Sequence, residues 1–242
     1  MSEAPTLRLS GDFDHAGRPL FSGLDLMISA GGWTCLLGPS GVGKSTVLRL
    51  LAGLDTGGRF SGTITADDNK AVAGRIAFMA QTDLLAPWLD VLGNVTLGAR
   101  LRGERADLER ARALVERVGL TEHAAKLPAS LSGGMRQRVA LARVLMEDRP
   151  IVLLDEPFAA LDARTRAEMQ ELAFETLEGR TVLLVTHDPA EAVRLGHRIF
   201  ILSEQGLAEV EAPALLPIRA VEAPETMDMQ VRLFRALKGE AA

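Results

Sequence analysis

The chain has 242 residues, and 27 lysines and arginines against 32 aspartates and glutamates give it a formal net charge of −5. Its hydrophobic fraction of 47% and charged fraction of 24% are typical of a soluble globular protein, and its mild acidity argues against a nucleic-acid binder with a broad basic surface. One cysteine excludes an intramolecular disulfide, and no apolar run reaches the roughly 18 residues of a spanning helix. No signal peptide is evident either, so we expect a cytoplasmic protein.

Short runs rich in leucine and β-branched residues alternate with longer stretches of helical period, a pattern typical of α/β folds. The predicted strands are Thr6–Leu9, Leu24–Ile28, Trp33–Leu37, Gly62–Ala66, Arg75–Ala80, Ile151–Leu154, Thr181–Val185 and Arg198–Leu202. The predicted helices are Lys44–Ala52, Asn94–Leu101, Leu108–Val118, Met135–Met146, Arg164–Leu177 and Pro189–Leu195, with a last one near Met229–Leu237. Because Ile151–Leu154 and Thr181–Val185 are apolar at consecutive positions, we expect both faces of these strands to be buried, as in a parallel sheet.

The stretch from about 91 to 148 is almost entirely helical in pattern and lies between two blocks that contain strands. We therefore predict a single domain over residues 1–242. It would have an α/β core of about 1–90 and 149–210, an inserted helical subdomain of about 91–148 and a short tail of about 211–242.

A glycine-rich segment after the predicted strand Trp33–Leu37 matches the phosphate-loop pattern G-x-x-x-x-G-K-[ST]. It opens the next predicted helix, which is the strand–loop–helix setting that the pattern requires. Glycines let backbone N–H groups converge on phosphate oxygens, and the helix N-terminus adds partial positive charge. Lys44 is expected to reach the β- and γ-phosphates and the Ser45 hydroxyl to bind Mg²⁺. The residues predicted to bind nucleotide here are Gly38, Pro39, Ser40, Gly41, Val42, Gly43, Lys44, Ser45 and Thr46.

Two adjacent carboxylates end the apolar strand Ile151–Leu154. Ligands of an open parallel sheet gather at the carboxyl ends of its strands, so Asp155 is placed to hold Mg²⁺ and Glu156 to act as general base on the attacking water. The alternative for these two residues is a solvated strand end before the turn at Pro157.

The segment Leu131–Arg138 reads LSGGMRQR, and here the sequence resembles the ATP-binding subunits of ABC transporters, whose signature is LSGGQ. The resemblance runs from about Leu7 to Leu202. It implies a P-loop NTPase ABC ATPase core with an N-terminal antiparallel β part and an inserted helical subdomain, with ATP and Mg²⁺ as cofactors. In this family two subunits form an ATP-dependent head-to-tail dimer, in which Ser132, Gly133 and Gly134 of one subunit contact the γ-phosphate bound by the other.

Three more positions fit the family's order of motifs. Gln81 resembles the glutamine that senses Mg²⁺ and the γ-phosphate, and Asp162 resembles an aspartate that faces the partner subunit. His187 stands where the family has a histidine that contacts the γ-phosphate. The alternatives are a surface glutamine, a plain helix N-cap and a structural histidine, respectively.

The family often stacks adenine on an aromatic side chain, commonly tyrosine, upstream of the phosphate loop. This chain has no tyrosine, so Phe13 is the candidate and His15 the second choice. Stacking needs only a π face, which phenylalanine supplies. The alternative of equal weight is that Phe13 packs in a β core.

The segment Leu84–Val95 resembles the LLPW-x-T-V-x-x-N-V pattern of importers for nitrate, sulfonates, taurine and the pyrimidine precursor of thiamine, with Ala86 inserted and Asp90 in place of threonine. Its apolar side chains are expected to form the groove that receives a cytoplasmic helix of the permease. The alternative is that Leu84, Leu85 and Trp88 are core residues. The first expectation for the cargo is hydroxymethylpyrimidine.

Taken together, these motifs predict the ATP-hydrolysing subunit of an importer on the cytoplasmic face of the inner membrane. Its partners would be a second copy of itself, a separate permease and, indirectly, a periplasmic binding protein, and no nucleic acid. A soluble ABC ATPase with an assembly or scaffold role is the alternative, but it leaves the Leu84–Val95 pattern without a purpose.

Overall fold

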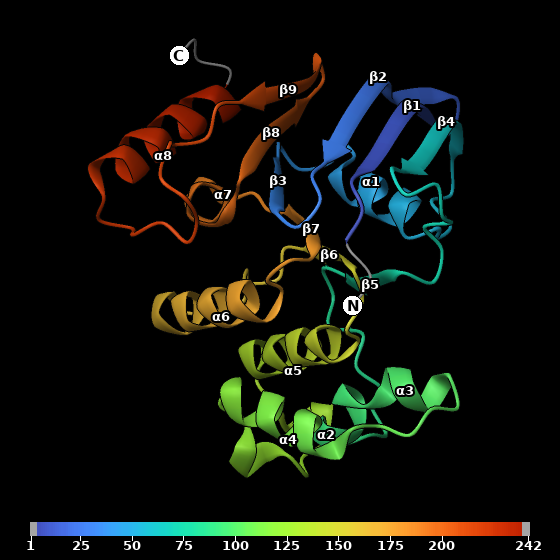
Figure 1. Cartoon of the computed structure of the whole chain (residues 1–242), viewed down its shortest axis with the longest axis vertical. Coiled ribbons are helices and arrows are strands. Elements are labelled where there is room, and N and C mark those ends of the chain that lie inside the picture. Colours follow the sequence, from blue (N-terminus) through green and yellow to red (C-terminus); the bar gives the residue numbers. More distant parts are fainter. Residues whose placement is uncertain (1–3, 239–242) are drawn as a thin grey trace. The chain divides into compact units, whose positions relative to one another are not determined.

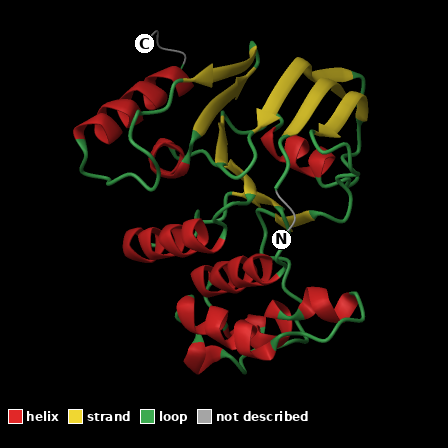
Figure 2. Cartoon of the chain, in the orientation of Figure 1, coloured by secondary structure: helices red, strands yellow, loops and turns green. Residues whose placement is uncertain are grey.

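The computed structural model describes residues 4–238, in which the chain forms two compact units (Figure 1). Unit 1 contains the chain up to Ile76, Pro150–Asp155 and the chain from Glu178 onward, and unit 2 contains Ala77–Arg149 and Glu156–Leu177. Figure 2 shows that the large sheets belong to unit 1 and most of the helices to unit 2. The assignment of the whole chain to one domain remains a prediction.

An antiparallel three-stranded sheet forms the N-terminal part of unit 1, in the order β2-β1-β4. Its strands are β1 (Leu7–His15), β2 (Arg18–Ile28) and β4 (Arg59–Ala66). In β1, Leu7 and Leu9 are buried and the residue between them is exposed, which is the period of two expected when one face of a sheet meets a core. The antiparallel β part expected from the family resemblance is therefore present.

A mainly parallel sheet forms the rest of unit 1, with neighbouring strands in the order β6-β7-β3-β8-β9. The strands are β3 (Trp33–Leu37), β6 (Ile151–Asp155), β7 (Thr181–Val185), β8 (Arg198–Ser203) and β9 (Gly206–Val210), while β5 (Ile76–Met79) begins at the last residue before unit 2. Every residue of β6 and β7 is buried, so the prediction that both faces are covered is confirmed.

The sequence analysis missed β9, which returns antiparallel to β8 through a two-residue turn. Its residues are exposed or half-buried, so it lacks the apolar run that marks a central strand. The helices of unit 1 are α1 (Lys44–Leu51), α7 (Pro189–Leu195) and α8 (Pro224–Leu237), and α8 packs on α7. Helix α8 starts five residues before the predicted Met229, with Pro224 in the first turn, where proline is well tolerated.

Unit 2 is mostly helical, and it extends beyond the predicted helical stretch of about 91–148 to Ala77 and to Glu156–Leu177. Its helices are α2 (Val91–Val95), α3 (Leu97–Leu101), α4 (Leu108–Arg117), α5 (Gly133–Met146) and α6 (Ala163–Thr176), with short 3-10 turns at Thr121–His123 and Pro128–Ser130. The prediction of one helix over Asn94–Leu101 is wrong. Two short helices meet at Thr96, whose hydroxyl donates to the carbonyl of Leu92 at 2.9 Å, a local bond that competes with regular helix geometry.

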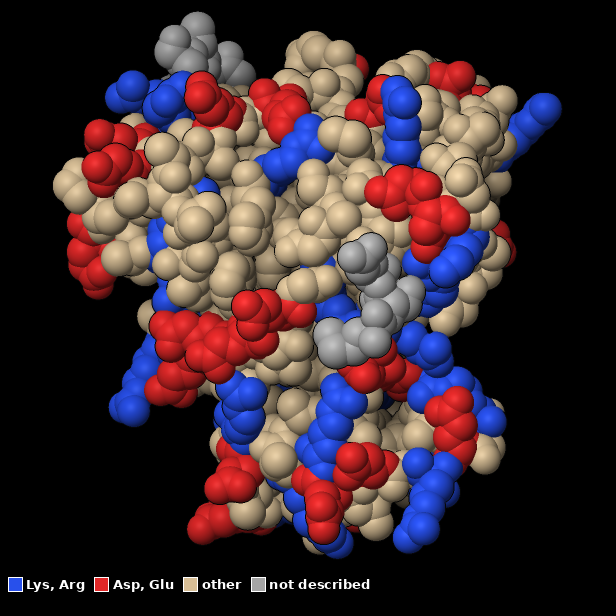
Figure 3. All heavy atoms as spheres, in the orientation of Figure 1, with Lys and Arg blue, Asp and Glu red and all other residues tan. Residues whose placement is uncertain are grey.

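Within residues 4–238, no helix has both the length and the apolar character that crossing a bilayer requires. On the face drawn in Figure 3, side chains of both charge signs are interspersed.

Candidate nucleotide site

Three neighbouring parallel strands of unit 1 bring the predicted phosphate residues to one edge of the sheet. Strand β3 leads into the loop from Gly38, β6 ends at Asp155, and β7 leads into Thr186 and His187. The register pairs Asp155 with Val185 and Leu36 with Val185, so these strand ends lie level with one another. Since adjacent strands are about 4.8 Å apart, this edge gathers the phosphate loop, an acid and a histidine.

The phosphate loop is organised around Lys44. Its ammonium group donates to the carbonyls of Gly38 at 2.7 Å and Pro39 at 2.8 Å, and the residue is only 7% exposed. The tip of the loop, from Pro39 to Gly41, is exposed. Lys44 is thus held inside the loop with its charge directed toward the side on which a phosphate would lie.

Backbone conformation explains why glycine stands at the start of this loop. Gly38 has a φ of +153°, and a Cβ there would overlap the carbonyl oxygen of Leu202. Glycine at this position therefore lets the loop pass against that carbonyl before it reaches the N-terminus of the eight-residue helix α1, where backbone N–H groups favour an anion. This donor set fits a polyphosphate. Asp155, which is 5% exposed, and the Ser45 hydroxyl together fit Mg²⁺. This ion commonly takes one or two protein oxygens and completes its shell with phosphate and water.

A buried hydrogen-bond chain fixes the backbone around His187. The Thr186 hydroxyl donates to Glu191 at 2.7 Å and accepts from the Asp188 N–H at 3.0 Å, and Thr186 and Glu191 are 1% and 4% exposed. Asp188 then caps α7 by accepting from the Ala190 N–H at 2.9 Å. His187 itself is exposed, on a turn that these contacts hold in place.

In unit 2, Gln81 and Glu156 lie together although 75 residues separate them in sequence. The Gln81 side-chain amide is 3.5 Å from a Glu156 carboxylate oxygen, at the long limit of a hydrogen bond. Glu156 has a φ of +49°, a left-handed conformation that is uncommon for a residue other than glycine. Such strain persists only where the surroundings hold it, and it is frequent at functional sites.

The group that holds Glu156 is Gln137 on α5, a residue that the sequence analysis did not single out. Its side-chain nitrogen donates to the Glu156 carbonyl at 2.9 Å, and its oxygen accepts from the Ala160 N–H at 2.8 Å. Gln137 is 8% exposed, so both bonds are made away from bulk water. The only sequence signal was a polar residue one helical turn after Gly134 and Gly133, on the side of α5 that is otherwise apolar.

The signature segment caps its helix as the sequence suggests. The Ser132 side chain accepts from the Met135 N–H at 3.2 Å, and Gly133 and Gly134 form the first turn of α5. Ser132 and Gly133 are exposed, so they are available to a second molecule. Their contact with a partner's nucleotide remains a prediction.

Asp162 is the N-cap of α6. Its carboxylate accepts from the Thr165 N–H at 3.0 Å and from the Thr165 hydroxyl at 2.7 Å, and these two bonds hold the pKa of Asp162 below its ordinary value. Capping alone thus accounts for this residue within one chain. Its proposed orientation toward a partner subunit is untested.

The assignment of Phe13 to adenine stacking is wrong in this structure. Phe13 is 1% exposed and stacks on Phe21 with 5.7 Å between the ring centroids, so its ring has no free face. The β-core alternative holds because Phe13 falls on the inward side of the β1 alternation. His15, two residues further on, is exposed and becomes the candidate.

The segment Leu84–Val95 consists of a loop that leads into α2, and the loop has an apolar exposed side. Leu84 and Trp88 are 65% and 76% exposed, so they are not core residues, while Leu85 is half-buried. Asn94, fully buried, accepts from the Ala86 N–H and donates to the carbonyls of Ala86, Leu89 and Asp90 at 2.9–3.2 Å. The Asn94 side chain therefore fixes the backbone of the inserted Ala86.

Helix α5 anchors the start of the same loop. Arg143 donates to the carbonyls of Asp83 and Leu84, both at 2.8 Å, and Arg136 forms a 2.9 Å ion pair with the Asp83 carboxylate. Burial lowers the pKa of Arg143 from its ordinary value, and the charges of Asp83 and Glu147 oppose that shift. Sequence patterns alone did not reveal these long-range contacts.

The parallel sheet, the phosphate loop and the strand-end carboxylate define a P-loop nucleotide-binding protein. A family model described as "ABC transporter" matches residues 21–159. An uncharacterized ABC transporter ATP-binding protein of Haemophilus influenzae is 45% identical over 93% of this chain and 95% of its own length, and an aliphatic sulfonates import ATP-binding protein, SsuB, of Delftia acidovorans is 43% identical over 93% and 90%. The chain belongs to the ABC transporter family, as one of its ATP-binding, ATP-hydrolysing members.

Solved structures agree with this assignment. The dimeric post-hydrolysis ATP-binding cassette MJ0796 bound to ADP and Pi aligns with a TM-score of 0.75 at 30% identity, over 86% of this chain and all of that one. A second dimeric structure of MJ0796, a bacterial ABC transporter cassette, aligns with a TM-score of 0.73. The predicted fold class is therefore confirmed.

Proposed function

We propose that this protein is the energy-coupling subunit of a membrane importer whose cargo is an aliphatic sulfonate. The observation that carries the proposal is the segment Leu84–Val95, which exposes Leu84 and Trp88 although side chains of Asn94 and Arg143 hydrogen-bond its backbone. A large apolar side chain that is exposed on a hydrogen-bonded loop is typical of a site that binds another protein. The names of several relatives at 40–47% identity, sulfonate import ATP-binding proteins, favour this cargo over the pyrimidine precursor.

In the proposed mechanism each nucleotide-binding residue has one task. Lys44 and the N–H groups at the start of α1 neutralise phosphate charge, and Ser45 and Asp155 are the residues that would hold Mg²⁺. When bound, Mg²⁺ supplies charge neutralisation between the β- and γ-phosphates. Glu156 takes a proton from the attacking water, and Gln81 and His187 hold the geometry around it.

A second copy would complete the site. Ser132 and the first turn of the 14-residue helix α5 offer backbone N–H donors at a helix N-terminus, which favours an anion such as a phosphate. We propose that they meet the γ-phosphate held by Lys44 of the second copy, so that ATP joins the two copies and its hydrolysis releases them. The proposed place of the complex is the cytoplasmic face of the inner membrane, with a periplasmic binding protein delivering the cargo to the permease.

Replacing Trp88 with Ser tests the permease contact. We expect co-purification with its permease to weaken by about 30-fold or more, the size of a tryptophan hot spot, while ATP hydrolysis by the isolated subunit is unchanged. Leu101→Ser is the matched control, since Leu101 is 78% exposed in the same unit but outside the loop. Equal binding by the two variants would contradict the docking role.

A separate measurement tests the cargo. ATP hydrolysis by the complex in vesicles should depend on an aliphatic sulfonate and should not respond to hydroxymethylpyrimidine.

Replacing Gln137 with Glu tests whether this residue positions Glu156. A carboxylate cannot donate to the Glu156 carbonyl, so that carbonyl loses its 2.9 Å bond and keeps the longer 3.4 Å bond from the Ala159 N–H, while the bond from Ala160 remains. We expect kcat to fall between about ten- and a hundred-fold with little change in KM for ATP, as for a misplaced catalytic group. A variant whose KM rises while kcat stays constant would show that Gln137 serves nucleotide binding instead.

A further inference from the structure

Helix α8 is apolar on two opposite sides. Thr226, Met229 and Leu233 are buried, and the helix packs on α7. Three more apolar side chains, Met227, Val231 and Phe234, are 55%, 51% and 53% exposed. Residues spaced by four and three lie on one helix face, so these three form a continuous exposed stripe, which we call the α8 stripe.

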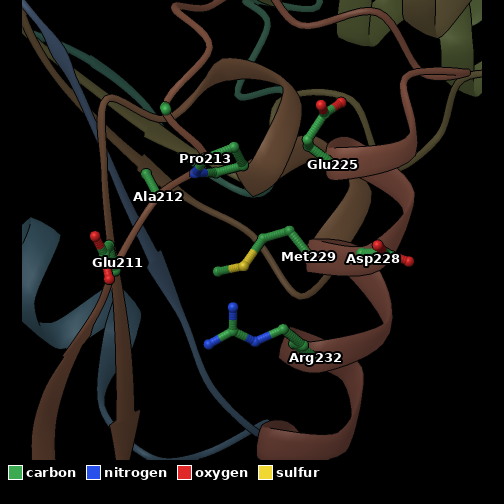
Figure 4. A pocket seen from close by; sticks show the side chains of 8 residues that line it. Glu211, Ala212, Pro213, Glu225, Asp228, Met229 and Arg232 are labelled. Atoms are coloured by element: carbon green, nitrogen blue, oxygen red, sulfur yellow. The ribbon is translucent and has the colours of Figure 1, made fainter.

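Charged residues border the α8 stripe in a set order. At about 100° per residue, Asp228 and Arg235 fall along the same edge of the stripe, one turn before and one turn after Val231. A cavity of about 240 Å³ lies beside α8, and Asp228 is among the residues that line it, while Figure 4 shows Met229 extending toward its interior. Neither Asp228 nor Arg235 forms a side-chain hydrogen bond or ion pair with any residue of the described part of the chain.

We propose that the α8 stripe is a docking surface for the α8 stripe of a second copy of this protein, with the two helices antiparallel and Val231 at the two-fold axis. In antiparallel pairing about Val231, each edge of the stripe meets the same edge of the other helix. Met227 then lies beside Phe234 of the second copy, and Asp228 lies beside Arg235 of the second copy. Both contacts occur twice, as an isologous interface requires. Parallel pairing would instead set the edge with Asp228 and Arg235 against the apolar edge with Met227 and Phe234, so the charges select the antiparallel arrangement.

The ring of Phe234 is compatible with this contact. The Lys238 ammonium lies 4.4 Å from the ring centroid and covers one face. The edge and the other face remain for Met227 of the second copy, and methionine sulfur packs favourably at aromatic edges.

The interface is small. Helix α8 has 14 residues and is about 21 Å long, and one such helix pair buries less than the roughly 1,200 Å² of a standard stable interface. The contact is therefore transient on its own, and it strengthens when another interaction holds two copies together. No residue of the stripe belongs to the proposed nucleotide set, so failure of the ATP-dependent dimer and failure of this contact are separate results.

Cysteine cross-linking tests this contact directly. The native Cys35 is fully buried and burial raises the pKa of its thiol, so it does not compete. In V231C two thiols meet at the two-fold axis, and a mild oxidant should produce a disulfide-linked dimer about ten-fold faster than in L216C, whose position is 80% exposed but outside the stripe. Cross-linking of V231C at the rate of L216C would overturn the proposal.

Charge reversal then tests the antiparallel order. In the V231C background, R235E should slow cross-linking about five-fold, since two attractive pairs become repulsive, and adding D228R should restore the rate. Thermal unfolding of each variant checks that α8 remains folded. A double variant as slow as R235E, with α8 intact, would overturn the antiparallel pairing.

Discussion

Glu156→Gln is expected to lower ATP turnover by about a hundred- to ten-thousand-fold, the contribution of a positioned general base, while leaving ATP bound. The amide is isosteric, so the left-handed backbone at +49° and the bond from Gln137 are retained. Only the ability to accept the proton of the attacking water is removed. ATP that is bound but not hydrolysed should then keep two copies joined.

Size-exclusion chromatography with light scattering, with and without Mg·ATP, measures this directly. The Glu156→Gln protein should shift from monomer to dimer on addition of ATP, whereas the control Glu178→Gln, an exposed carboxylate in the turn before β7, should hydrolyse ATP like the wild type. A Glu156→Gln protein with wild-type turnover would remove Glu156 from the mechanism. If turnover falls but no dimer forms, repeating the run with the permease shows whether the permease is needed to bring the two copies together.

Lys44→Ala is expected to weaken ATP binding by about 10- to 150-fold, the loss associated with a hydrogen bond to a charged group. Lys44 is the cation that the loop itself encloses, with its nitrogen 2.7–2.8 Å from two loop carbonyls. Removing it leaves the phosphates with backbone donors alone. Isothermal titration with ATP in the presence of Mg²⁺ gives the affinity.

Lys44→Met is the matched control for packing, because it keeps an unbranched side chain of similar length in this nearly buried position. It should lose as much affinity as Lys44→Ala but less thermal stability. Unchanged ATP affinity in both variants would contradict the assignment of Lys44 to the phosphate site.

Local sequence alone determined the elements whose residues carry a strong, uninterrupted pattern. Three elements have their predicted bounds, namely the strands Trp33–Leu37 and Thr181–Val185 and the helix Pro189–Leu195. In each of them consecutive residues carry the pattern, either an apolar run for a strand buried on both faces or a cap followed by an amphipathic turn. The phosphate loop was also predicted from sequence, since a strand–loop–helix motif brings its residues together without long-range contacts, and Asp155 was predicted from its place at the end of an apolar strand.

Tertiary structure decided which side of an element faces inward and which distant residues meet. Phe13 lies on the same side of β1 as Leu7 and Leu9, and only the packing against β2 showed that its ring is covered by Phe21 and not open to a ligand. Likewise the support of Glu156 by Gln137 and of the Leu84–Val95 loop by Arg143 joins residues 19 and 59 positions apart. Sequence predicted the nucleotide-site residues because each lies in a short local motif, whereas the residues that position them are specified only by how the helices pack.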